Sequence, residues 1–175
     1  MAVAKPELRQ SFQKKIAKCY SQAMFKGLYE THLNVVNLES SVDFYQNTLE
    51  LELCYFEKNR RAAFFWIGEP KQSMLGLWEK PKAEVIPDHF AFECEPDWVL
   101  NESIPYLKKK NLDYRNFLNT EDKSPMVFSW MPAIAIYFND PDGHSLEFIG
   151  ILDAKARPEL GVVSYEKWSK LAYND

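Results

Sequence analysis

The sequence predicts an α+β protein in which two βαβββ modules form a cupped mixed sheet with flanking helices. Three observations predict this fold. A short histidine-containing strand, a polar break and an amphipathic helix occur twice in this order, in residues 30–49 and 87–107. Extended segments with alternating apolar residues follow each copy. Apolar residues at helical spacing also occur in residues 5–26, outside the two copies.

The first module is expected at residues 28–84, and its first strand contains His32. The helix after this strand is predicted from Ser40 and Asp43, which have the spacing of a helix-capping pair. An apolar stripe continues it through Val42, Tyr45 and Leu49. The remaining strands of the module are expected within two extended segments, residues 51–68 and 72–80.

The second module is expected at residues 85–152, and its first strand contains His89. Pro96 and Asp97 mark the start of its helix, because proline is tolerated in the first helical turn and an acidic residue favours it. Pro105 lies inside the helical pattern and predicts a kink or an early end. The remaining strands are expected within residues 112–118, 127–138 and 144–152.

The two flanks are predicted to be helical. Residues 1–27 have the pattern of an amphipathic arm, and the tail at 153–175 is expected to contain a short helix. The arm is basic, with six basic groups and one acid in residues 1–26. A free helix of this length would be marginal in water, so both flanks are expected to pack on the cup or on a second subunit.

Residues 137–150 predict a hairpin that closes the second module. Asp140-Pro141-Asp142-Gly143 is a turn sequence, because proline fixes φ, aspartate bonds to nearby backbone and glycine accepts positive φ. Glu147 lies in the strand after the turn. Glutamate is a poor strand former, and burying a carboxylate is costly unless it is paired or bound to a metal. Glu147 is therefore either a surface residue or part of a functional site.

The period of two along a strand decides between these alternatives. His32, His89 and Glu147 each lie opposite the apolar residues of their own strand, which should pack beneath a helix. All three are therefore predicted to point into the concave face. Two neutral imidazoles and one carboxylate, with other positions open, suit a divalent first-row metal. His144 lies on the opposite face and is interpreted as a turn residue that hydrogen-bonds locally.

Composition excludes several classes of protein. A chain with 46% hydrophobic and 15% aromatic residues is globular. No run has the length of a membrane span, and the N-terminus lacks the apolar core of a signal peptide. A membrane is therefore not expected as a partner. The basic arm has no aromatic interleaving and no recognised motif, so nucleic acid is not expected either. Three cysteines without CxxC spacing predict no disulfide or zinc framework and favour the cytoplasm.

The stretch "SVDFYQNTLELEL" after a histidine-bearing strand, together with "IYFNDPDGHSLEFIG", resembles the glyoxalase/bleomycin-resistance/extradiol-dioxygenase superfamily. The resemblance covers about residues 28–152 and implies the vicinal oxygen chelate fold. In that fold, paired modules form a cup around one divalent ion, here Mn, Fe, Zn or Ni, with His32, His89 and Glu147 as ligands. The resemblance also implies a small-molecule substrate and a homodimer, with the metal site within one chain or shared between subunits.

Departures from the superfamily narrow the activity. Glyoxalase I has a fourth ligand, a glutamate on the last strand of its first module, where this sequence has Gly76. The three-ligand pattern resembles that of the fosfomycin-resistance thiol transferases, which implies a low-molecular-weight thiol as cosubstrate. These transferases have a tyrosine ten residues before the glutamate ligand, and Tyr137 matches it. The transferases also bind the phosphonate group of their substrate through a lysine and a serine. This sequence has Val127 and Met131 at about those two positions, which argues against a phosphonate substrate.

Four aromatic residues are candidates to line the cup, although each is equally compatible with a core or interface position: Trp66, Trp78, Phe128 and Trp130. A pocket lined by several of them would favour an apolar or aromatic ligand.

The leading hypothesis is a metal-dependent enzyme acting on a small oxygen-chelating substrate, by glyoxalase-like isomerisation or by thiol addition to an electrophile. The metal would act as a Lewis acid, and Tyr137 would orient the substrate or donate a hydrogen bond. Two alternatives stay open: a bleomycin-resistance-type protein that sequesters an aromatic ligand, and an iron(II) extradiol dioxygenase.

Overall fold

A computed structural model describes residues 25–172 of the chain. The predicted N-terminal arm therefore lies almost entirely outside the described residues. The first sheet contains β1 (Glu30–Val35), β2 (Leu53–Glu57), β3 (Ala62–Ile67) and β4 (Ser73–Glu79). Its strand order is β1-β4-β3-β2, with β1 parallel to β4 and the other pairs antiparallel.

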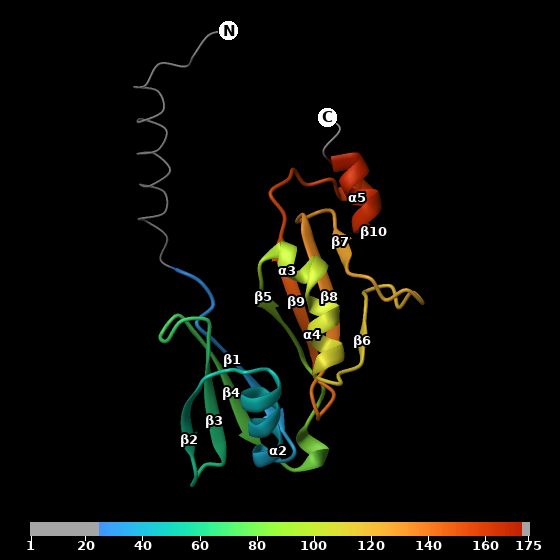
Figure 1. The fold of residues 1–175 in the computed structure, drawn as a ribbon. Helices are drawn as coiled ribbons and strands as arrows, with labels where there is room; N and C mark the ends of the chain where they lie inside the picture. The colour runs from blue at the N-terminus through green and yellow to red at the C-terminus, as the bar shows by residue number, and fades with distance from the viewer. Residues whose placement is uncertain (1–24, 173–175) are drawn as a thin grey trace, which may run out of the picture.

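The second sheet repeats this arrangement and extends it (Figure 1). It contains β5 (His89–Glu93), β6 (Tyr114–Arg115), β7 (Met126–Phe128), β8 (Ala133–Asn139), β9 (Ser145–Ile151) and β10 (Val162–Ser164). The order is β10-β7-β8-β9-β5, with β6 paired to β8 and β5 parallel to β9. The predicted α+β fold is confirmed, and each half of the chain forms a mixed sheet of its own.

The helices and short helical turns are α2 (Leu38–Asp43), η1 (Phe44–Thr48), η2 (Lys82–Glu84), α3 (Pro96–Asn101), α4 (Ser103–Lys109), η3 (Pro158–Leu160) and α5 (Tyr165–Ala172). In Figure 1, α2 lies in front of the first sheet, and α3 and α4 lie in front of the second. We call the opposite side of each sheet its open face. Among residues 25–172, no helix has the length and apolar character needed to span a bilayer.

Two helix boundaries follow from local chemistry. The capping pair predicted at Ser40 and Asp43 is wrong, because Asn37 caps α2 and its side chain accepts a hydrogen bond from the Ser40 N–H at 2.8 Å. The predicted break near Pro105 is confirmed and falls at Glu102, between α3 and α4. Proline has no N–H to donate to the carbonyl four residues earlier, so a continuous helix is disfavoured there.

One hydrophobic core runs through both modules. Leu33 and Val35 of β1 and Leu146 of β9 are fully or almost fully buried in the same cluster. They lie on the helix-covered sides of their sheets, as the alternation along each strand predicts. The open faces therefore receive the opposite set of side chains.

The hairpin turn after β8 ties the second module to the first. The Tyr45 hydroxyl donates to Asp140 Oδ2 at 2.9 Å, and the Val36 N–H donates to Asp142 Oδ2 at 3.1 Å. The His144 ring lies 2.9 Å from the Asn34 carbonyl through Nε2. We call Asn34, Tyr45, Asp140, Asp142 and His144 the module clasp.

The interpretation of His144 as a locally bonded turn residue is correct for its backbone, whose N–H donates to Asp140 Oδ1 at 2.8 Å, but not for its ring. Its ring is fully buried, and the two groups it bonds lie 56 and 110 residues away in the sequence. The Asp88 N–H can only donate, so Nδ1 accepts, and the Asn34 carbonyl can only accept, so Nε2 donates. The turn pattern did not predict the contacts of the ring, because both partners come from other strands and loops.

Replacing Tyr45 with phenylalanine is expected to lower the free energy of unfolding by about 2 kcal/mol, because a buried carboxylate oxygen then loses its donor. Tyr45 is fully buried, and within the described residues it alone donates to Asp140 Oδ2. Urea unfolding at neutral pH measures the change. The matched control is Tyr55→Phe, since the Tyr55 hydroxyl bonds Glu57 on the exposed surface and its loss should cost under about 0.5 kcal/mol. Equal effects of the two variants would contradict the role given to the clasp.

Candidate metal centre

His89 and Glu147 lie together on the open face of the second sheet. The parallel pairing of β5 with β9 puts His89 beside Ser145, two residue pairs away from the Ala91–Glu147 pair and on the same face. His89 Nε2 lies 3.2 Å from Glu147 Oε2. The Glu147 side chain is only 5% exposed, whereas the His89 side chain is half exposed. The site therefore combines a buried carboxylate with an accessible imidazole.

The tautomer of His89 leaves a lone pair facing this carboxylate. His89 Nδ1 lies 2.8 Å from the Ser145 carbonyl oxygen, which can only accept, so Nδ1 carries the proton. In the neutral ring, Nε2 and Glu147 Oε2 are then two acceptors in contact. Two acceptors in contact repel each other. A metal ion bound by both atoms, or a proton added to one of them, would make the contact favourable. A backbone carbonyl on the far nitrogen is also the usual way of orienting a metal-binding histidine.

Glu147 has a second feature that fits a cation. Its other oxygen, Oε1, is buried and has no hydrogen-bond partner within the described residues. Burial raises the pKa of Glu147, and the neighbouring Tyr137 and His89 oppose that effect. Such a group is costly to keep charged without a partner. Two ligands bound to one ion at about 2.1 Å lie roughly 3 Å apart, which matches the observed separation of the two side chains.

Tyr137 lies directly opposite Glu147 in the pairing of β8 with β9. Burial, and then the Glu147 charge, raise the pKa of Tyr137 well above its ordinary value. The phenol therefore stays protonated at physiological pH and is a hydrogen-bond donor, for which the neighbouring Glu147 carboxylate is an acceptor. Its ring also packs near the His89 ring, with centroids 5.9 Å apart.

The structure places His32 on the open face of the other sheet. Its Nε2 lies 3.6 Å from Glu30 Oε2, and its ring packs near Phe64 and Trp78. Within residues 25–172, no three histidine, cysteine or carboxylate side chains lie close enough to hold one metal ion. One chain therefore brings together His89 and Glu147 but leaves His32 apart from them.

Gly76 lies directly beside His32 in the pairing of β1 with β4. A Cβ atom at Gly76 would lie 2.5 Å from Cδ2 and 2.9 Å from Nε2 of His32. The position therefore excludes any side chain unless the imidazole moves. A fourth carboxylate ligand cannot occupy this place while His32 keeps its observed position.

The four aromatic residues predicted to line a cup are divided between the sheets. Trp66 and Trp78 lie on the open face of the first sheet, where Trp78 packs against His32. Phe128 is buried in a cluster with Tyr137 on the second, and the half-exposed Trp130 packs on Phe128. They do not line one common pocket within the described part of the chain.

A cavity of about 720 Å³ separates the edge strands β1 and β5. Its walls include Glu30 and Thr31 on one side and His89, Ala91 and Glu93 on the other. Among the described residues, β1 and β5 therefore contribute to one cavity without pairing with each other.

Sequence reasoning missed Arg115. This residue lies on β6 opposite Tyr137, with its Cζ atom 4.9 Å from the centre of the Tyr137 ring. Its Nη2 donates to Ser145 Oγ at 2.7 Å, so the guanidinium crosses β8 and reaches β9 next to His89. The strand β6 has only two residues, which is too short for a periodic signal to assign the face of Arg115.

These features define an α+β protein of two related modules whose open sheet faces carry imidazoles and one buried carboxylate. A family model described as the Glyoxalase/Bleomycin resistance protein/Dioxygenase superfamily matches residues 27–148, more than half of the chain. The chain belongs to this superfamily, and the predicted resemblance is confirmed.

Several solved structures are similar to this chain. An integron cassette protein from the mobile metagenome of the Halifax Harbour sewage outfall is 32% identical, with a TM-score of 0.61, and the match covers 73% of this chain and 100% of that one. A lactoylglutathione lyase from Agrobacterium tumefaciens is 19% identical, with a TM-score of 0.56 and coverages of 73% and 96%. The fosfomycin resistance protein FosX from Mesorhizobium loti is 23% identical, with a TM-score of 0.51 and coverages of 74% and 96%. The last two show the fold alone.

Proposed function

We propose that the protein is a metal-dependent enzyme that acts on a small substrate with metal-chelating oxygen atoms. The observation that carries this proposal is the contact between His89 Nε2 and Glu147 Oε2 at 3.2 Å, beside a buried carboxylate oxygen without a partner. His89, Glu147 and His32 would hold the ion. The ion, when bound, would supply Lewis-acid stabilisation of negative charge on a substrate oxygen.

We propose further that His32 comes from a second copy of the chain. The shared core and the module clasp fix the two sheets relative to each other within one chain. Joining His32 to Glu147 within one chain would need a change in this arrangement, in which His32 does not cluster with His89 and Glu147. A homodimer in which the first open face of one copy covers the second open face of the other needs no such change. It would also cover Trp78 and Trp130, which the single chain leaves partly exposed.

Tyr137 is proposed to orient the substrate. Its hydroxyl stays protonated beside Glu147, so it can donate a hydrogen bond to an oxygen of a bound molecule. The packing of Phe117 and Phe128 near the Tyr137 ring gives this side of the site an apolar wall. Water is thereby limited around the donor, which strengthens its interaction with a substrate oxygen.

The reactions that fit this site best are glyoxalase-like isomerisation and addition of a low-molecular-weight thiol to a small electrophile. Ring-cleaving dioxygenation is the next candidate reaction. Two similar structures bear the names lactoylglutathione lyase and fosfomycin resistance protein, which agrees with the first two classes. The cytoplasm is the proposed location, since the cysteines have no disulfide spacing.

Little or no isomerisation of the methylglyoxal–glutathione hemithioacetal is expected, because Gly76, beside His32, supplies no carboxylate as a fourth ligand. Spectrophotometric assay of the purified protein loaded in turn with nickel, zinc, manganese or iron(II) measures it. Thiol addition to a panel of small epoxides, run with the same preparations, is the comparison. Robust glyoxalase turnover would mean that three protein ligands suffice for that reaction here.

A second function, sequestration of an aromatic ligand, is favoured by the half-exposed aromatic side chains on the first open face. Phe64 and Trp78 pack edge to face there, and the Tyr55 ring stacks on Phe64. Metal dependence separates the two proposals. A sequestering protein would bind an aromatic ligand equally well before and after treatment with a chelator, whereas the enzyme would lose substrate affinity.

A further inference from the structure

Arg115 carries a positive charge beside the proposed metal ligands and has no role in binding the metal. Its guanidinium donates to Ser145 Oγ, and the backbone carbonyl of Ser145 accepts the Nδ1 proton of His89. Arg115 and Glu147 flank Tyr137, since β8 lies between β6 and β9. Neighbouring strands are about 4.8 Å apart, so the backbones of Arg115 and Glu147 are roughly 10 Å apart. The guanidinium itself reaches further towards His89 by bonding Ser145.

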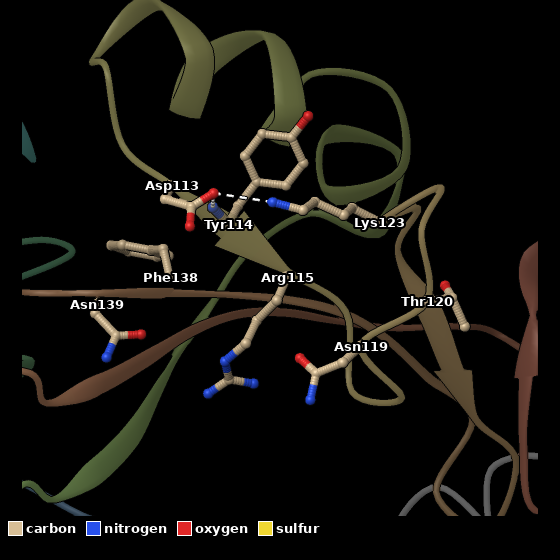
Figure 2. A pocket seen from close by; sticks show the side chains of 8 residues that line it. All are labelled: Asp113, Tyr114, Arg115, Asn119, Thr120, Lys123, Phe138 and Asn139. Carbon is tan, nitrogen blue, oxygen red and sulfur yellow. Dashed lines mark hydrogen bonds and ion pairs between the residues drawn. The ribbon is translucent and has the colours of Figure 1, made fainter.

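A cavity of about 370 Å³ opens at Arg115 (Figure 2). In Figure 2 the guanidinium points between the side-chain amides of Asn119 and Asn139. Lys123 lines the same cavity, but it extends in another direction and pairs with Asp113 at 3.0 Å. The cavity thus presents one guanidinium with two amides, and Arg115 lies on the same face of the sheet as Glu147, whereas Tyr114 and Phe138, which also line the cavity, lie on the opposite face.

The charge of Arg115 is not balanced by a direct partner. Within residues 25–172, it makes no ion pair, and its hydrogen bond and ring contact are with the neutral groups of Ser145 and Tyr137. A guanidinium carries five N–H donors in a planar fork that matches carboxylate and phosphate oxygens. Arg115 is also half-buried, so its side chain is held in place and its remaining donors face the cavity.

We propose that Arg115 binds an oxyanion group, a carboxylate or phosphate, of the substrate, while another substrate oxygen faces His89 and Glu147. This inference rests on the proposed function and gives its substrate class: a small anionic molecule. The aromatic ring of Phe117, exposed beside Phe128 and Tyr137, would contact an apolar part of the same molecule. Arg115 thereby fixes the orientation of the substrate.

Titration calorimetry with benzoate and phenyl phosphate tests the proposal, with benzyl alcohol as the neutral control. The intact chain is titrated after chelator treatment and again after reloading with manganese, whose content is measured separately. We expect both anions to bind far better than benzyl alcohol, and Arg115→Gln to weaken the tighter anion at least about 10-fold, because charge-assisted hydrogen bonds are lost. Arg115→Lys should recover part of the affinity. The tighter anion shows whether a carboxylate or a phosphate is preferred.

Lys123→Gln is the matched control, because it removes a cation from the same cavity that already has a carboxylate partner. It should change anion affinity less than about 2-fold, and circular dichroism should show all variants folded. Equal anion binding by the wild type and Arg115→Gln, or no anion binding by the wild type, overturns the proposal even if manganese binds at Glu147. Arg115-dependent anion binding in a protein that retains no metal supports the anion site and contradicts the proposed metal enzyme instead.

Discussion

Replacing Glu147 with glutamine is expected to weaken the binding of a divalent metal ion by at least about 100-fold, because even loss of a group that only orients a ligand costs 10- to 100-fold. The amide keeps the size of the side chain but cannot supply a charged oxygen to the ion. Elemental analysis after dialysis, followed by titration with manganese or zinc, measures the effect. Equal metal retention by the wild type and the variant would remove the basis of the proposed site.

The matched control is Glu93→Gln. Glu93 lies on β5, on the same face as His89, but it is exposed and pairs with Ile149 instead of a candidate ligand. Its loss should leave metal affinity within about 2-fold, since an exposed carboxylate contributes little at a distance. A similar loss in both variants would indicate a general effect of negative charge on the open face.

The metal-free Glu147→Gln variant should be at least as stable as the metal-free wild type at neutral pH. Burial raises the pKa of Glu147, so the folded state favours its protonated form. The corresponding stability is fully present below the unfolded-state pKa and is lost as the pH rises through the folded-state pKa. Glutamine does not ionise, so the variant does not lose this stability as the pH rises. A low metal content of the Glu147→Gln variant could therefore not be explained by poor folding.

His32→Ala is expected to lower metal content as severely as Glu147→Gln, although the two residues lie on different sheets of one chain. An imidazole is a strong ligand for first-row ions, and its loss would leave the site with His89 and Glu147 only. Asn34→Ala is the control, because Asn34 is exposed on the same face of β1 and only its backbone joins the module clasp. Full metal content in His32→Ala would restrict the site to one sheet.

The sequence predicted the parts of the structure that depend on local rules. The turn at Asp140–Gly143 and the alternation after it place Glu147 opposite the apolar side of β9, and the same rule applies to His89 on β5. The first helix cap was missed because Asn37 and Ser40 offer similar side-chain acceptors, and only the backbone geometry distinguishes them.

The sequence did not predict features that depend on contacts between residues far apart in the chain. The clasp through His144 joins groups 110 residues apart, and no periodicity encodes such a contact. The same is true of Arg115, whose strand has two residues. The proposed pairing of His32 with Glu147 depends on how two open faces meet, which the pattern of one chain does not specify.

The metal content of a mixed dimer tests the shared site most directly. Chains carrying His32→Ala and Glu147→Gln are co-expressed with different affinity tags and purified sequentially, and the metal-to-protein ratio of the mixed dimer is compared with that of each parent. If His32 of one copy completes the site of the other, one of the two sites in the mixed dimer keeps all three ligands. We therefore predict about one metal ion per mixed dimer and almost none in either parent. A mixed dimer as empty as its parents would contradict a site shared between two copies of the chain.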